Sequence, residues 1–330
     1  MKIDAKEIKN ILAIRTDRFG EFILTLPAIF ALKENFSKSR LTVMAHPYST
    51  ELIRGNKTID EILEYDDSLN RGIVRTIKTI NEIRKHRFDL AVIFNPKKKF
   101  HLITFLAGIP IRVGYGRKWR FLLNRKIKDL KSLGIKHEID YNFDLVKAIG
   151  VDSDNRLPSV FIDKEEEGQA LKILAKRGIN NESGFIIIHP WTSDSIKQWP
   201  VHNFIELAVK IVKETNLSVV IIGGKEEVIK SQEYFTNLND SIIDLTGKTT
   251  LKELAGLFKK TKLLISGDSG PVHLACCVDI PVIAIFRSDI PGKSATRWGP
   301  KSKGSIIIEK NNLDDITVAE VLDKVRSVIG

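Results

Sequence analysis

Residues 263–286 read LLISGDSGPVHLACCVDIPVIAIF, a succession of strand, polar loop, helix, turn and strand. The opening apolar residues predict a buried strand, and two glycines frame Asp268 and Ser269 in the loop that follows. Pro271 falls in the first turn of the predicted helix, where its missing N–H leaves no hydrogen bond unmade. The chain then turns into the apolar strand 282–286. A glycine-rich loop between a strand and a helix presents free backbone N–H groups, so this stretch indicates a phosphate-binding site.

The same alternation of apolar strands and amphipathic helices runs through the chain and predicts an α/β fold with doubly wound parallel sheets. The 330 residues exceed one ordinary core, so we expect two consecutive Rossmann-like domains that face a central cleft. Thr317 and Glu320 form the pattern of a capping box and predict a final helix. The strands are expected at residues 10–14, 41–45, 89–95, 111–114, 185–189, 218–223, 242–245, 263–265, 282–286 and 305–309.

The composition is that of a globular protein, with 43% hydrophobic and 28% charged residues. The two cysteines, Cys276 and Cys277, are adjacent, and their scarcity fits a reducing compartment. The first ten residues lack the apolar core of a signal peptide, and no apolar run approaches the roughly 18 residues of a spanning helix. We therefore expect a cytoplasmic protein.

The net charge of +11 lies entirely in the first half of the chain. Residues 1–164 contain 31 basic and 20 acidic residues, whereas residues 165–330 contain 21 of each. A solvated basic face would explain this, as would an anionic partner such as a phosphorylated substrate, a membrane leaflet or a nucleic acid. We favour the substrate or the membrane, because no nucleic-acid-binding module is visible. Part of the excess is clustered, at Lys97, Lys98, Lys99, Arg112, Arg117, Lys118, Arg120, Arg125 and Lys126.

Three polar loops directly follow apolar strands, where ligands of open α/β sheets bind. In the first loop Glu21 follows Gly20 at a helix start and could act as a general base, with Asp17 as an alternative. A helix-terminal charge without chemistry would also explain Glu21. Arg15 and Arg18 could meet an anionic substrate, or could pair with the two carboxylates.

The second loop is HPWTSDSIKQWP, residues 189–200. Its hydroxyl groups and Lys197 could bind a diphosphate whose negative charge grows as it leaves. A solvated surface loop would also explain this composition. His189 is better explained as a structural histidine. In the third loop Asp268, Ser269, Gly270 and His273 would face the same cleft as Lys197. Glu226 follows another strand and could bind a ribose, or could be an ordinary surface glutamate.

Several site classes are missing from the sequence. It contains no G-x-G-x-x-G, no Walker A sequence and no cysteine or histidine cluster with metal-ligand spacing. These absences argue against a dehydrogenase, a P-loop kinase and a zinc enzyme.

Three stretches together resemble glycosyltransferase family 9, the bacterial lipopolysaccharide heptosyltransferases. They are IRTDRFGEFILTLPAIFAL (14–32), HPWTSDSIKQWP (189–200) and LTGKTTLKELAGLFKKTKLLISGDSGPVHLACCVDIPVIAIF (245–286). The resemblance implies a GT-B fold with an acceptor domain at 1–164 and a nucleotide-sugar domain at 165–312. It also implies that the final helix, within 313–330, crosses back onto the first domain.

By this resemblance Glu21 occupies the position of the family's catalytic base, where the family usually has aspartate. Lys197 matches the lysine that neutralises the leaving diphosphate, Thr192 and Ser193 match its hydroxyl contacts, and Glu226 matches a nucleotide contact. Two sets remain. The donor-binding pattern D-[ST]-G-x-x-H falls on Asp268, Ser269, Gly270 and His273, and the acceptor-binding candidates are Arg15, Arg18, Lys98, Arg117 and Arg120.

The resemblance thus implies an inverting glycosyltransferase, without metal or cofactor, that moves a heptose from ADP-heptose to the lipopolysaccharide inner core. Its partners would be the nucleotide-sugar donor, a phosphorylated acceptor and the anionic inner leaflet of the inner membrane, to which it could bind peripherally, with no nucleic acid. Three alternatives stay open. They are a transferase of the same fold that uses another nucleotide sugar, a sugar-nucleotide epimerase, and a degenerate binder of sugar nucleotide or glycolipid without turnover.

Overall fold

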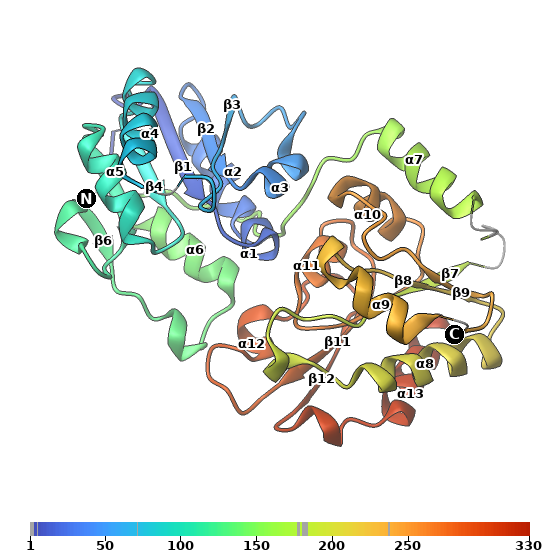
Figure 1. Ribbon diagram of the computed structural model, residues 1–330. Helices are drawn as coiled ribbons and strands as arrows, with labels where there is room; N and C mark the ends of the chain where they lie inside the picture. Colours follow the sequence, from blue (N-terminus) through green and yellow to red (C-terminus); the bar gives the residue numbers. More distant parts are fainter. Residues whose placement is uncertain (1–2, 5, 71, 177–178, 180–183, 237) are drawn as a thin grey trace. The chain divides into compact units, whose positions relative to one another are not determined.

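The computed structural model describes residues 3–4, 6–70, 72–176, 179, 184–236 and 238–330. The chain divides into two compact units, Met1–Phe161 and Ile162–Gly330, and each is built around its own parallel sheet (Figure 1). None of the helices in the described residues is both long enough and apolar enough to cross a membrane.

The first unit contains a six-stranded parallel sheet in the order β3-β2-β1-β4-β5-β6. The central strands are continuous runs of buried apolar residues, as expected for a parallel sheet that is covered on both faces. The strands are β1 (Asn10–Arg15), β2 (Arg40–Ala45), β3 (Glu61–Glu64), β4 (Leu90–Ile93), β5 (Ile111–Tyr115) and β6 (Arg125–Ile127). The edge strand β6 lies inside the basic segment, where the sequence predicted no strand.

The helices of the first unit are α1 (Phe19–Ile23), α2 (Leu26–Asn35), α3 (Pro47–Thr50), α4 (Ile73–Lys85), α5 (Lys98–Leu106) and α6 (Glu138–Lys147). Helices α4 and α5 pack together and share a core with β1 and β4 (Figure 1). The helical spacing of residues 22–32 predicts a helix in which Pro27 marks a kink or a late start. The structure has two helices here, and Pro27 stands in the first turn of α2.

The second unit repeats the plan, with the strand order β12-β11-β10-β7-β8-β9. The strands are β7 (Phe185–His189), β8 (Ser218–Ile221), β9 (Ile242–Asp244), β10 (Leu264–Gly267), β11 (Val282–Arg287) and β12 (Ile306–Lys310). The helices are α7 (Lys164–Ala175), α8 (Val201–Glu214), α9 (Val228–Phe235), α10 (Leu251–Phe258), α11 (Gly270–Cys276), α12 (Ala295–Trp298) and α13 (Val318–Ile329).

The expected boundary at 164/165 falls inside α7. A capping box between Asp163 and Glu166 fixes the start of this helix, and the chain divides between Phe161 and Ile162. The sequence predicts a helix over residues 165–177 that is ended by Gly178, and this end lies outside the described residues.

The resemblance implies that the final helix crosses back onto the first domain, and in the structure α13 lies within the unit Ile162–Gly330. Its apolar face joins the core of the second unit, and Arg326 pairs with Glu214 of α8 at 2.6 Å. The predicted capping box is only half formed. Thr317 accepts the Glu320 N–H at 3.2 Å, but the Glu320 carboxylate pairs with Lys310 at 2.6 Å instead of turning back to the helix start.

In both sheets the order in which successive strands are added reverses at the centre. The chain runs outward from β1 through β2 and β3, then returns to place β4 on the other side of β1; β7 and β10 have the same relation in the second unit. In open α/β sheets the loops at the carboxyl ends of such neighbouring strands form the ligand-binding crevice. The loops after β1 and β4, and after β7 and β10, are therefore the places to look for a site.

Candidate functional site

The loops after β7 and β10 touch each other. A Cβ atom at Gly267 would lie 3.2 Å from Cγ2 of Thr192 and 3.4 Å from the carbonyl oxygen of Lys197. Lys197 ends a short 3₁₀ turn, η4 (Ser195–Lys197), and its ammonium forms an ion pair with the carboxylate of Asp268. The two side chains are 17% and 7% exposed. The structure therefore brings together the two residues that the sequence placed in the second and third loops.

A histidine and two serines form a second contact between these strands. The Nδ1 atom of His189 lies 3.1 Å from the hydroxyl oxygens of both Ser266 and Ser269, which are 2.8 Å apart. Burial lowers the pKa of His189 to about 3, so the ring is neutral at pH 7. His189 thus ties β7 to the loop after β10, in agreement with the structural role expected for it.

The other donor-binding candidates occupy different environments around these loops. The Thr192 hydroxyl donates to the carbonyl of Asp194 at 2.9 Å, whereas Ser193 is exposed. His273 is buried in α11, with its ring centroid 6.3 Å from that of Trp298. Gly270 begins α11 directly after Ser269.

Of the two glutamates after β8, Glu226 is exposed and Glu227 is structural. The Glu227 carboxylate accepts the Gly224 N–H at 2.7 Å at the start of a helical turn. The same loop packs on the loop after β7, since a Cβ atom at Gly223 would lie 2.7 Å from the Trp191 ring.

A fourth loop, after β11, was missed by sequence reasoning. Lys293 pairs with Asp194 at 2.7 Å, and Arg287 donates to the Ile196 carbonyl at 3.4 Å while its guanidinium pairs with Asp289 at 2.6 Å. The loop adds cations beside η4. The available signal was its position after the apolar strand 282–286, because the carboxyl ends of parallel strands lie at one edge.

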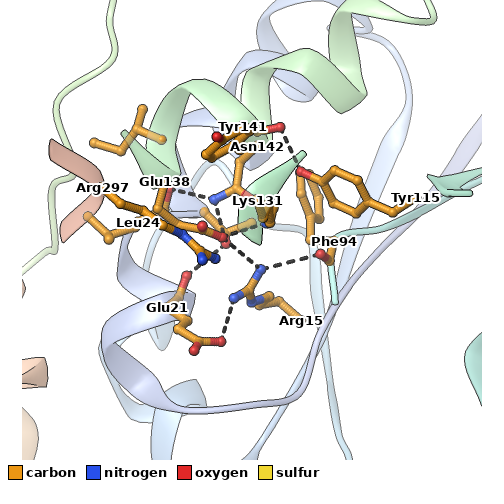
Figure 2. A network of polar contacts seen from close by, with 12 residues as sticks. Arg15, Glu21, Leu24, Phe94, Tyr115, Lys131, Glu138, Tyr141, Asn142 and Arg297 are labelled. Atoms are coloured by element: carbon orange, nitrogen blue, oxygen red, sulfur yellow. Dashed lines mark hydrogen bonds and ion pairs between the residues drawn. The ribbon is translucent and has the colours of Figure 1, made fainter. Parts of the chain in front are cut away.

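In the first unit Arg15 organises the loop after β1. Its guanidinium bonds Asp17 through Nε at 2.6 Å. It bonds Glu21 through Nη2 at 2.6 Å, and Nη1 donates to the Phe94 carbonyl at 3.3 Å (Figure 2). The side chain is only 3% exposed. Arg15 was one of the acceptor-binding candidates, but the structure makes it an internal partner of the two carboxylates.

A buried charged pair that the sequence did not reveal stands behind Arg15. Glu138 of α6 is fully buried, forms an ion pair with Lys131 and lies 3.6 Å from Nη1 of Arg15. Lys131 also donates to Asn142 at 3.2 Å, and Asn142 donates to the Leu24 carbonyl at 3.0 Å (Figure 2). The network links α6 to the end of α1, across more than a hundred positions of the chain.

This cluster holds two cations, Arg15 and Lys131, and three carboxylates, Asp17, Glu21 and Glu138. Burial raises the pKa of Asp17 to about 6; the Arg15 charge opposes the rise and the Glu21 charge adds to it. Burial would also raise the pKa of Glu21, but the Arg15 charge and the hydrogen bonds from Asp17 and Arg15 prevail and lower it to about 2. As the pH falls, Asp17 therefore takes up a proton before Glu21 does.

The remaining acceptor-binding candidates come from separate segments. Arg18 is exposed after β1, and the Lys98 ammonium at the start of α5 lies 5.1 Å from the centre of the Trp119 ring. After β5, Arg117 pairs with Asp129, and Arg120 is exposed at the start of η2 (Arg120–Leu122).

Within the part of the chain that the structure describes, no group of three or more histidine, cysteine, aspartate or glutamate side chains could hold a metal ion.

Comparison with known proteins gives these loops a context. A Haemophilus influenzae protein named only as a glycosyltransferase is 26% identical over 305 residues, covering 89% of this chain and 86% of the relative. Lipopolysaccharide heptosyltransferase 2 of Salmonella typhimurium is 24% identical over 353 residues, covering 97% and 99%. The solved structure of Escherichia coli ADP-heptose LPS heptosyltransferase II is 21% identical, covers 97% of this chain and 98% of that chain, and has a TM-score of 0.81.

The structural match confirms the predicted GT-B fold with two parallel sheets. The model of glycosyltransferase family 9 (heptosyltransferase) matches residues 76–324. This range includes the loops after β7, β8, β10 and β11 and starts beyond the loop that carries Glu21. The match spans most of the chain, and the protein therefore belongs to glycosyltransferase family 9 and is a glycosyltransferase.

Proposed function

We propose that the protein transfers a heptose from ADP-heptose to the lipopolysaccharide inner core, with inversion and without a metal ion. The lipopolysaccharide heptosyltransferases among the proteins it resembles support the substrate class. The observation that carries the proposal is the Lys197–Asp268 pair, which holds a cation between the carboxyl ends of β7 and β10. That is the place where a nucleotide diphosphate binds in a doubly wound sheet.

On the donor side, Lys197 stabilises the departing diphosphate. As the bond between the anomeric carbon and the phosphate oxygen breaks, negative charge accumulates on the diphosphate, so a nearby cation stabilises the transition state more than the bound donor. Asp268 holds the ammonium in place before the donor binds. The loops after β7, β8 and β10 supply the rest of the donor site. Glu226 contacts the nucleoside. The phosphates and the sugar are bound by Thr192, Ser193, Ser269, Gly270 and His273.

On the acceptor side, a carboxylate in the loop after β1 takes the proton of the attacking hydroxyl. The hydroxyl oxygen then forms a bond to the anomeric carbon on the face opposite the diphosphate, which leaves with the bonding electrons. We assign the base to Glu21, the residue at the family's position, with Asp17 as the alternative. A base works best when its pKa lies near the working pH, which favours Asp17, whereas Glu21 is the more exposed of the two side chains.

The acceptor is a phosphorylated lipopolysaccharide core at the cytoplasmic leaflet, and no nucleic acid takes part. The basic excess of residues 1–164 supports an anionic acceptor, with Arg18, Lys98, Arg117 and Arg120 as the candidates to meet it. Arg15 contributes indirectly, by holding the two carboxylates.

The first test is a calorimetric titration of the whole protein with ADP-heptose, with a UDP-sugar as the comparison and a chelator present in a parallel series. We expect ADP-selective binding that the chelator does not change, and weaker binding by Lys197→Met. Lys210→Met is the matched control, because Lys210 lies on α8 in an exposed pair with Glu206.

Preference for the UDP-sugar would overturn the heptosyltransferase assignment, and loss of binding with the chelator would overturn the metal-independent one. Conversion of the donor without any acceptor would indicate an epimerase. Tight donor binding without transfer to any core acceptor would indicate a degenerate binding protein.

A further inference from the structure

Helix α4 carries an apolar surface that its own unit does not cover. In its first two turns Ile73 is 80% exposed, Val74 70% and Ile77 50%, and Leu69 just before the helix is 63% exposed. Further along the same helix, Ile80 and Ile83 are buried in the core of the first unit. The apolar side chains of the first two turns therefore lie largely outside the packing of this unit.

The exposed residues continue the buried face of the helix. Ile73, Ile77 and Ile80 are spaced by four and three residues, so they lie along one stripe. At about 1.5 Å per residue, the stripe extends roughly 10 Å from Ile80 to Ile73. The stripe is therefore covered by the core at Ile80 and exposed at Ile77 and Ile73.

Cations surround this surface. Arg75 and Lys78 are exposed on the same two turns of α4. The start of α5 lies beside the start of α4, because Lys99 donates to the Asn70 carbonyl at 2.6 Å and Lys97 pairs with Asp67.

Lys98 adds a further exposed ammonium at the start of α5, above Trp119. Of the acidic side chains just before α4, Asp67 is paired with Lys97 and lies 3.8 Å from the ammonium of Lys99, and Asp66 lies 3.8 Å from Nε2 of His46. The surroundings of the apolar residues are therefore cationic, as is the whole first half of the chain.

We propose that Leu69, Ile73, Val74 and Ile77, with Arg75, Lys78 and Lys98 around them, form an α4 docking face that binds the surface of an anionic lipid bilayer. The apolar side chains enter the boundary between headgroups and acyl chains, and the cations remain among the anionic headgroups. An apolar protein partner would not account for the cations, and a nucleic acid would not account for the exposed isoleucines.

The proposal is tested by co-sedimentation of the full-length protein with vesicles of phosphatidylcholine, with or without about one quarter phosphatidylglycerol. We expect binding to the mixed vesicles only, with an affinity that falls as salt is raised. Ile73→Glu and Val74→Glu should each weaken binding about tenfold or more, since each places a charge where an apolar side chain was buried. Lys78→Glu should weaken it to a smaller extent.

Ile229→Glu is the matched control, because Ile229 on α9 is also 80% exposed but belongs to the second unit. Equal loss in Ile229→Glu and Ile73→Glu, or full binding by Ile73→Glu, would overturn the proposal. So would a dimer in size-exclusion chromatography that Ile73→Glu dissociates, since a second copy would then cover the face. Donor titration needs no vesicles and vesicle binding needs no donor, so this proposal and the proposed transferase activity fail independently.

Discussion

Replacing Lys197 by methionine keeps most of the side-chain volume but removes the cation between β7 and β10. If Lys197 stabilises the leaving diphosphate, kcat should fall about 100- to 1,000-fold, the usual effect of losing one donor that acts on developing negative charge. The substitution also removes the Lys197 ammonium from the Asp268 carboxylate, which is 7% exposed. Because Lys197 itself is 17% exposed and water can reach the pair, we expect a loss in unfolding free energy of about 1–3 kcal/mol, below that of a fully buried pair.

Asp268→Asn separates the two effects. It breaks the same ion pair but leaves the Lys197 ammonium, so stability should fall by a similar amount while kcat falls at most about tenfold. The assays are urea unfolding for stability and initial rates of heptose transfer from ADP-heptose at saturating donor. If the two variants lose kcat equally, Lys197 acts only through the pair and its role toward the diphosphate is refuted. Both substitutions together test the coupling, which should appear in stability more than in rate.

Three further predictions concern proton binding and packing. Asp17 carries a proton below its raised pKa of about 6. If Asp17 is the base, kcat/KM should therefore rise as the pH passes through about 6, and Asp17→Asn should abolish this rise. A kcat/KM that stays constant down to pH 5 would instead assign the base to Glu21, whose pKa is about 2. The lowered pKa of His189, about 3, means that its contribution to stability is complete above the unfolded value of about 6.5 and is lost as the pH falls toward 3. The loss should be about 1.4 kcal/mol per pH unit, and urea unfolding of His189→Gln at several acidic pH values should lack that slope. Trp199→Phe removes the indole donor to the Ile316 carbonyl, 2.9 Å away, and should lower the unfolding free energy by about 1–3 kcal/mol in urea melts while leaving donor binding unchanged.

The sequence predicted the central strands because β1, β7 and β11 are runs of apolar residues, the pattern of a strand buried on both faces. It missed β6, since Arg125-Lys126-Ile127 forms a short, polar edge strand that carries no such signal. The last helix was correctly predicted as a helix from its capping pattern. Its apolar stripe shows that it must pack somewhere, and only the folded chain shows that the partner is α8.

The sequence likewise predicted part of the candidate donor site and missed part of it. Lys197 and Asp268 could be placed in loops after strands, and parallel pairing of β7 and β10 brings those loops together, so local pattern and topology were sufficient. Lys293 and Arg287 were not found, because their contacts with residues 194 and 196 span 99 and 91 positions and leave no local signature.

By itself, the sequence determined the alternation of helices with the central strands, the two parallel sheets and three of the loops that carry polar groups, since each of these depends on local apolar pattern and short-range spacing. Only the tertiary structure decided the charge states in the loop after β1. The pKa values of Asp17 and Glu21 diverge because folding buries both carboxylates beside Arg15, with the Lys131–Glu138 pair behind it. Burial and charge across distant segments determine proton affinity, and neither can be read from the order of residues along the chain.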